Sequence, residues 1–267
     1  MVNRNLKYQQ KLVQRLFKTF LQGNMMKGYV WVLLLAMTSM ECVAGFDEGA
    51  AAYEAKDYTT AFREFLPLAN DGDAKSQAKL GLMYDNGEGV AQNYGKAVLW
   101  YRKAAAQDNA DAQYYLGLMY YKGNGVAQDY SQAAHFFRKA AEQGNPSAQF
   151  YLGNMYRNGE GVAQNYRKSA DLYRKAAEQG HSNALNNLGV TYEVGLGVGK
   201  NLVLAHIFYN LAAVNGDTKV KNNRDEITPQ LTSAQLSEAQ ELASKWVKGQ
   251  PLPTLSKTYP SSSHKKK

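Results

Sequence analysis

The chain has 267 residues, of which 45% are hydrophobic and 12% aromatic, which is enough to bury a globular core. Its net charge of +8 comes from the two ends, because residues 1–44 hold six basic residues against one acidic residue and three lysines close the chain. The body between the ends has equal numbers of basic and acidic residues, so it lacks the basic stripe that neutralises phosphates, and we expect no nucleic-acid binding.

An apolar stretch at residues 29–37 follows Lys27 and precedes a polar segment with small residues at Cys42 and Ala44. This order is typical of a secretory signal peptide, and the stretch is shorter than the ~20 residues of a membrane-spanning helix. We therefore expect cleavage after Ala44 and an exported protein, periplasmic or secreted, without stable membrane insertion. A retained membrane anchor is the alternative. Cleavage would remove Cys42, the only cysteine, and with it any disulfide or thiolate metal site.

The first 24 residues are basic, with apolar residues at partly helical spacing, which is unusual in a signal peptide. One interpretation is that translation starts at Met25 or Met26 instead of Met1, which would leave a short leader of the usual kind. The other interpretation is an amphipathic helix that lies on a membrane surface.

Residues 45–73 precede a set of internal repeats and share part of their pattern. Three of their residues, Tyr58, Ala61 and Phe65, fall in the places that Tyr94, Ala97 and Tyr101 occupy in the first repeat. We expect this segment to form a helix pair that caps the N-terminal end of the repeats.

The repeats occupy residues 74–216 as four units of 36 residues. In each unit a leucine–glycine pair is followed by a tyrosine and then by a G-x-G-V turn. The first glycines of these units are Gly81, Gly117, Gly153 and Gly189. So many positions that recur together predict a tandem array of one structural unit.

Within a unit, apolar and small residues fall three and four positions apart, as at Ala133, Phe137 and Ala140, which predicts two antiparallel helices. The first helix should end at the G-x-G turn, where glycine adopts positive φ at little cost. Gly117 and its equivalents lie inside the first helix, where glycine costs about 1 kcal/mol relative to alanine. We expect close approach of the second helix to offset that cost, with the pair Ala140 and Ala141 as the matching depression. The fold class is thus all-α, an αα-hairpin repeat solenoid.

Downstream, the period is lost, and residues 217–248 are predicted to form C-terminal capping helices. Thr232 and Gln235 have the spacing of a capping box that opens the last helix. Residues 249–267 are rich in Pro, Ser and Lys, which predicts a disordered basic tail, with a basic contact arm as the alternative.

The repeat pattern also carries a family resemblance. The unit A-x-x-x-L-G-x-M-Y-x-x-G-x-G-V, followed by A-x-x-[WF]-[YF]-R-K-A-A-E-Q-G, resembles the Sel-like repeat family, which is related to the tetratricopeptide repeats. The resemblance implies a tetratricopeptide-like right-handed superhelix that binds a peptide or partner protein in a concave groove. Residues 46–72 are similar to a more generic tetratricopeptide repeat.

Two motifs could carry chemistry, and we assign it to neither. The four G-x-G turns follow helices, whereas phosphate-binding loops follow strands and open helices. The histidines of the body, His135, His181 and His206, lie at unrelated positions of different repeats and lack metal-ligand spacing. We therefore predict no catalytic residue, no metal site and no cofactor.

The binding groove is predicted from the alignment of the first helices on the similar tetratricopeptide signature. The groove positions, which include Ala78 and Leu118, differ between units while the packing positions repeat. Aromatic, arginine and asparagine side chains in the central units are the best candidates for partner contacts. They are Tyr114, Tyr121, Phe150, Asn154, Arg157 and Asn186. That these positions are merely solvated is the alternative.

The predicted function is a non-enzymatic protein–protein interaction scaffold or adaptor of the cell envelope, expected to be a monomer that holds a peptide or protein ligand. The alternative is an exported protein that binds cell-wall fragments or β-lactams and hydrolyses them weakly, because cysteine-rich members of the similar family have been linked to penicillin binding. This sequence lacks their paired cysteines.

Overall fold

The computed structural model describes residues 45–215 and 218–255, in which helices are joined by turns and no strand occurs. The chain divides into two compact units, Met1–Glu48 and Gly49–Lys267, and the labelled helices described below belong to the second. The predicted leader and residues 256–267 of the predicted tail lie outside the described residues. None of the described helices combines the length and apolar character that crossing a bilayer requires.

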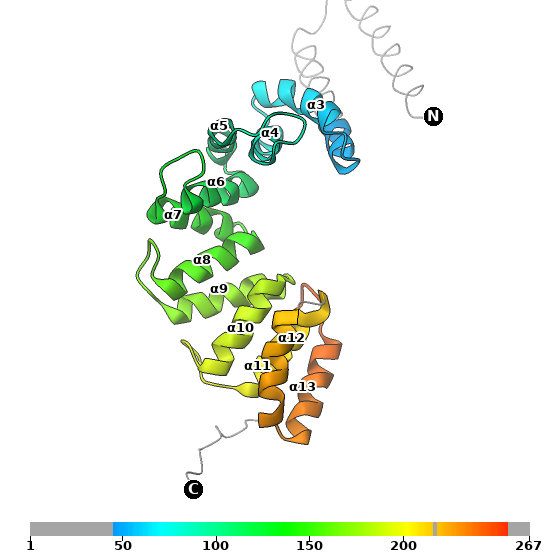
Figure 1. The fold of residues 1–267 in the computed structure, drawn as a ribbon, viewed down its shortest axis with the longest axis vertical. Helices are drawn as coiled ribbons and strands as arrows, with labels where there is room; N and C mark the ends of the chain where they lie inside the picture. The colour runs from blue at the N-terminus through cyan, green and yellow to red at the C-terminus, as the bar shows by residue number, and fades with distance from the viewer. Residues whose placement is uncertain (1–44, 216–217, 256–267) are drawn as a thin grey trace, which may run out of the picture. The chain divides into compact units, whose positions relative to one another are not determined.

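Within the described residues, consecutive helices carry the repeats and their N-terminal neighbour, and two more follow (Figure 1). Residues 45–54 are helical and precede α3 (Tyr58–Asn70). The four helix pairs are α4 (Ala74–Asn86) with α5 (Tyr94–Ala105), α6 (Ala110–Lys122) with α7 (Tyr130–Glu142), α8 (Pro146–Asn158) with α9 (Tyr166–Glu178), and α10 (Ser182–Val194) with α11 (Leu202–Ala212). We call α4, α6, α8 and α10 the first-helix layer and α5, α7, α9 and α11 the second-helix layer. The predicted αα-hairpin repeat solenoid is confirmed.

Polar side chains fix where each helix begins. Each second helix starts after an Asp or Asn whose side chain accepts a hydrogen bond from a backbone N–H of the first turn. For example, Asn93 Oδ1 accepts from the N–H of Lys96 at 2.9 Å. The first helices are capped in the same way, as Asn109 accepts the N–H of Ala112 at 2.9 Å. Each such cap stabilises its helix by about 1 kcal/mol. The caps recur with the repeat, so the chain restarts a helix at the same place in every unit.

The glycine inside each first helix lies against an aromatic ring of the second helix of the same unit. A Cβ on Gly117 would lie 2.7 Å from the ring of Phe137, and one on Gly189 would lie 2.6 Å from the ring of Tyr209. The expected close approach is therefore confirmed. The atoms nearest to the added Cβ belong to the ring of the second helix, and not to the pair Ala140 and Ala141.

The two glycines of each G-x-G turn have different roles. The first closes the first helix in the left-handed conformation, as Gly123 does at φ 75°, which confirms the predicted helix end. The second reaches the preceding unit: a Cβ on Gly125, at φ 69°, would lie 2.5 Å from the carbonyl oxygen of Tyr94 at the start of α5. Only a residue without a side chain allows that contact, so the second glycine sets the spacing between units.

Two buried glutamines, Gln113 and Gln149, bond within their own units, and Gln149 also reaches the preceding unit. The side chain of Gln143 donates to Oε1 of Gln113 at 2.8 Å, and Gln179 donates to Oε1 of Gln149 at 3.0 Å. Gln149 in turn donates to the carbonyl oxygen of Ala141 at 3.2 Å, so its buried amide is paired on both sides. The fourth unit has Leu185 at this position, and its side chain is buried in the C-terminal core.

The C-terminal segment covers the last helix pair. After a short 3₁₀ helix (Ala213–Asn215), α12 (Thr218–Ile227) and α13 (Ser233–Lys245) both pack against α11. The capping box predicted at Thr232 and Gln235 is present. Residues 249–255, assigned to the tail from the sequence, continue this packing: the N–H of Gly249 donates to the carbonyl oxygen of Glu178 at 2.8 Å, and Leu252 is buried in the core.

Candidate functional site

The six predicted groove residues all lie on the first-helix layer and are half-buried. The helix α6 carries Tyr114 and Tyr121, α8 carries Phe150, Asn154 and Arg157, and α10 carries Asn186. Two other predicted groove positions, Ala78 and Leu118, are each only 8% exposed and belong to the core. The repeat alignment therefore found the layer, but it did not separate its surface positions from its packing positions.

The aromatic members of the set meet around one residue that sequence reasoning missed. The ring of Tyr151 lies 6.0 Å from Tyr114, 6.0 Å from Tyr121 and 5.5 Å from Phe150, measured between ring centroids. These four residues form what we call the aromatic cluster. It joins α6 to α8, so it provides a continuous apolar strip across two units.

Tyr121 connects the aromatic cluster to the turn of the next unit. Its hydroxyl donates to Oε2 of Glu160 at 3.0 Å. Burial, followed by the bond to Glu160, raises the pKa of Tyr121 to about 12, so the phenol keeps its proton at neutral pH. Burial likewise raises the pKa of Tyr114 to about 12. Both tyrosines thus present neutral rings and hydroxyls, not charges.

Asn154 lies one helical turn after Phe150 on α8 and retains a free donor. Its Oδ1 accepts the hydroxyl of Tyr173 at 2.6 Å and the side-chain amide of Asn187 at 3.0 Å. Among the described residues its Nδ2 has no hydrogen-bond partner. Because the acceptor is held on both sides, the amide is fixed with its donor face unused.

Arg157 and Asn186 differ in how much of their side chains the fold already uses. Arg157 donates from Nε to Asn158 at 3.5 Å, and its remaining donors are unpaired among the described residues. Asn186 accepts from Asn223 of α12 at 3.1 Å and donates to Asn187 at 3.4 Å. Arg157 therefore remains available to a ligand, whereas Asn186 also holds the C-terminal helices.

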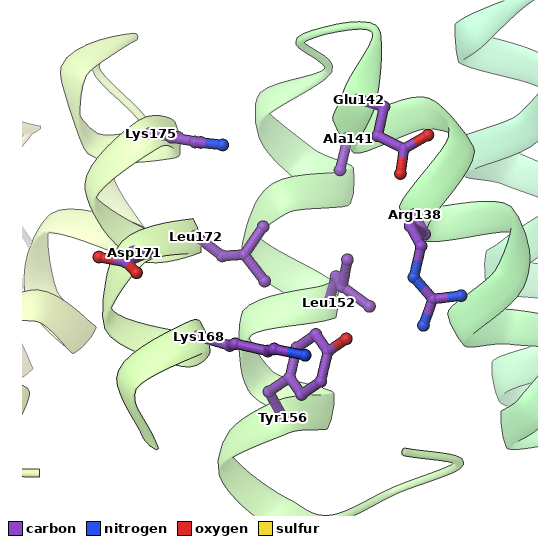
Figure 2. A pocket seen from close by; sticks show the side chains of 9 residues that line it. All are labelled: Arg138, Ala141, Glu142, Leu152, Tyr156, Lys168, Asp171, Leu172 and Lys175. Carbon is purple, nitrogen blue, oxygen red and sulfur yellow. The ribbon is translucent and has the colours of Figure 1, made fainter. Parts of the chain in front are cut away.

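A pocket of about 290 Å³ lies on the second-helix layer, between α7 and α9 (Figure 2). Its floor is apolar, with Leu152 of α8 and Leu172 of α9 facing each other beside Ala141 of α7. The ring of Tyr156 lies at one end. None of the six predicted groove residues lines it.

Charged side chains form the rim of this pocket. They are Arg138 and Glu142 of α7 and Lys168, Asp171 and Lys175 of α9. Lys168 Nζ lies 5.2 Å from the centroid of the Tyr156 ring, over the apolar floor. Asp171 pairs with Arg174 at 2.9 Å. The cations therefore outnumber the anions that face the pocket.

The three histidines of the described part lie apart from one another. His181 caps α10 through Nδ1, His206 is buried in α11, and His135 is exposed on α7. Burial lowers the pKa of both His181 and His206. Within residues 45–215 and 218–255, no three His, Cys, Asp or Glu side chains gather as they would around a metal ion.

Comparison with known proteins identifies the repeat. The Sel1 repeat model matches residues 74–109, 110–145, 146–181 and 182–217. The chain is similar to a Sel1 repeat protein from Oxalobacter formigenes, at 32% identity and a TM-score of 0.64, over 75% of this chain and 84% of that one. It is also similar to a protective antigen of uropathogenic Escherichia coli with an SLR fold, at 32% identity and a TM-score of 0.52, over 78% of this chain and 53% of that one. A comparison with curated proteins found no significant match.

The matched segments coincide with the helix pairs of the structure. Each begins at the first residue of a first-layer helix, at Ala74, Ala110, Pro146 and Ser182. Because the four segments together cover more than half of the chain, the protein belongs to the Sel1 repeat family.

Proposed function

We propose that this protein is a non-enzymatic scaffold that binds an extended segment of a partner protein along the first-helix layer. Sel1 repeat proteins are generally scaffolds for protein interaction. The specific surface proposed here consists of the aromatic cluster together with Asn154 and Arg157. A partner segment would place apolar side chains on the cluster and its backbone carbonyls or carboxylates near the two donors.

The observation that carries the proposal is the combination of rings and unused donors on one surface. Aromatic rings and arginine supply much of the binding free energy at protein interfaces, often about 2 kcal/mol or more per residue. The Asn154 amide is held by Tyr173 and Asn187 with its donor free, so little side-chain entropy is lost when it bonds a ligand. Asn186 contributes less, because α12 already occupies it.

We also propose that the protein acts outside the cytoplasm, in the periplasm or after secretion. The support is the leader pattern at residues 29–44, which lies outside the described residues. Fractionation of cells that express the tagged full chain tests this, and a tag recovered with the cytoplasmic fraction would contradict it.

The test of the binding surface must leave the fold intact. Replacing Tyr114 and Phe150 with alanine would remove ring contacts to Phe137 and Tyr173 as well, so lost binding could reflect lost packing. Asn154→Asp is sharper, because aspartate keeps the acceptor for Tyr173 and Asn187 and replaces only the outward donor. Arg157→Ala removes the second donor.

The experiment is crosslinking and quantitative capture from native envelope with the full chain as bait. We expect Asn154→Asp and Arg157→Ala each to lower recovery of the wild-type partner about tenfold or more. The matched controls are Asn210→Asp, whose Oδ1 likewise accepts a bond, from Arg224 at 3.3 Å, and the exposed Arg63→Ala. Equal recovery from variants and controls, with unchanged melting curves, would reject this surface.

A further inference from the structure

One position of the second-helix layer carries an aromatic ring in the first, second and fourth units and lacks it in the third. The equivalent residues, 36 apart, are Trp100, Phe136, Leu172 and Phe208. The pocket between α7 and α9 is lined by Leu172, the member of the set without a ring. The pocket therefore lies where an aromatic side chain is found elsewhere in this chain.

The junction of α5, α6 and α7 shows what that ring does. Phe136 stacks on Tyr120 with ring centroids 5.7 Å apart and planes inclined by 6°. Arg102 Nη2 donates to the hydroxyl of Tyr120 at 2.9 Å. Tyr120 is thus in contact with Phe136 through its ring and with Arg102 through its hydroxyl.

At the next junction the corresponding set of contacts is incomplete. Tyr156 and Arg138 take the places of Tyr120 and Arg102, but Leu172 has no ring to stack on Tyr156. Arg138 makes no hydrogen bond or ion pair with the described residues. About 290 Å³ is left between these side chains, at the lower limit of the ~300–1,000 Å³ of typical small-molecule sites and enough for a single large side chain.

The charges on the rim of the pocket determine which residues of a bound partner are favoured next to the side chain that enters the pocket. Arg138, Lys168 and Lys175 surround the pocket, and Glu142 is the acid that faces it, since Asp171 pairs with Arg174. The side chains of Lys168 and Lys175 extend over the pocket (Figure 2). Cations beside a ring favour it through the negative face of the π system, and they also attract carboxylates.

We propose that this pocket binds an aromatic side chain of a partner protein whose neighbouring residues are acidic. The ring stacks on Tyr156 between Leu152 and Leu172, and the flanking carboxylates meet Arg138, Lys168 and Lys175. This site lies on the second-helix layer and does not depend on the surface proposed above, so the two can fail separately.

The test is a titration of the full chain with short peptides, followed by NMR of its backbone amides. The probe is acetyl-Glu-Phe-Glu-amide, compared with acetyl-Glu-Ala-Glu-amide and acetyl-Lys-Phe-Lys-amide. We expect saturable shifts in α7 and α9 with the acidic aromatic probe, at a Kd on the order of 1 mM, and binding about tenfold weaker for each comparison peptide.

Two variants identify the pocket as the site. Leu172→Phe places in this unit the ring that Phe136 and Phe208 supply in theirs, so it should fold and abolish the shifts by filling the pocket. Lys175→Glu leaves the floor intact and should weaken binding of the acidic probe. Shifts that persist unchanged in Leu172→Phe, equal binding of the alanine peptide, or no saturable shifts with the wild type would each overturn the proposal.

Discussion

The third and fourth units share the same backbone but differ at one buried position in the first turn of the first helix. In the third unit this position is Gln149, whose side chain donates to the carbonyl oxygen of Ala141 in the preceding unit at 3.2 Å. The fourth unit has Leu185 instead, within the core that includes Val220 and Ile227 of α12. The glycine–ring contact, by contrast, is present in both, since Gly189 meets Tyr209 as Gly153 meets Tyr173. The glycine–ring contact is thus common to both units, and the residue at the buried position differs between them.

The largest effect should come from breaking the contact between units at a central turn. Gly125→Ala places a Cβ 2.5 Å from the Tyr94 carbonyl oxygen at φ 69°, and this clash is with a backbone atom and not with the end of a flexible side chain. We expect a loss of about 2–4 kcal/mol in the free energy of unfolding, measured by urea denaturation.

The matched control for this change is Gly123→Ala in the same turn. It has a similar φ of 75°, but its Cβ would lie 3.3 Å from the side chain of Gln128. It should lose only the cost of the left-handed conformation, about 1 kcal/mol. Equal losses for the two variants would mean that the second glycine has no role between units.

The next prediction exchanges the residues that the third and fourth units have at the buried position, Gln149 and Leu185. Gln149→Leu gives a central unit the residue of the fourth, and removes the bonds to Ala141 and Gln179. We expect a loss of about 1 kcal/mol in the free energy of unfolding, partly offset by the apolar burial of leucine.

The reciprocal change should cost more. Leu185→Gln buries an amide within the apolar C-terminal core, at about 1–3 kcal/mol. If both variants unfold at the wild-type urea midpoint, the residue at this position does not contribute to the stability of either unit.

The smallest effect concerns the cap of α10, which is His181, whereas Asn109 and Asn145 cap α6 and α8. Burial lowers the pKa of His181 below its ordinary value near 6.5, and its Nδ1 must be unprotonated to accept the N–H of Ala184. The unfolded chain therefore binds this proton more readily, so stability is present above about pH 6.5 and is lost as the pH falls through the folded pKa.

His181→Asn should keep the cap and remove this titration. We expect a change of only a few tenths of a kcal/mol near neutral pH and a smaller drop in Tm between about pH 7.5 and pH 5. Some drop should remain, because burial also lowers the pKa of His206. An identical pH profile for the wild type and the variant would show that His181 does not contribute.

The repeat period predicted most of the fold, because periodic glycines and aromatic residues report packing that each unit makes with itself. The helix end at Gly123 and the close approach at Gly117 followed from glycine chemistry alone. The contact between Gly125 and Tyr94 did not, since it depends on where the preceding unit lies in space. Nothing within one unit specifies that position.

The candidate surfaces were predicted less completely. The alignment placed Tyr114, Tyr121 and Phe150 on one layer. It did not identify Tyr151, whose ring lies among theirs, because residue 151 is not one of the aligned groove positions. The pocket was missed because sequence reasoning considered only the second-helix residues that recur in every unit. The sequence feature that could have revealed the pocket is Leu172, which stands where the other units have Trp100, Phe136 and Phe208. A leucine at an otherwise aromatic position leaves a space that a ring would fill.

The second glycine of each turn touches the unit before its own, and this has a consequence for how the array comes apart. A hairpin in the middle of the row cannot open alone, because its departure also frees the turn of the succeeding unit, which rests on its backbone. Unfolding of an internal unit therefore breaks the contacts with two neighbouring units, whereas unfolding of a terminal unit breaks the contacts with one. Melting should consequently begin at the termini and advance inward.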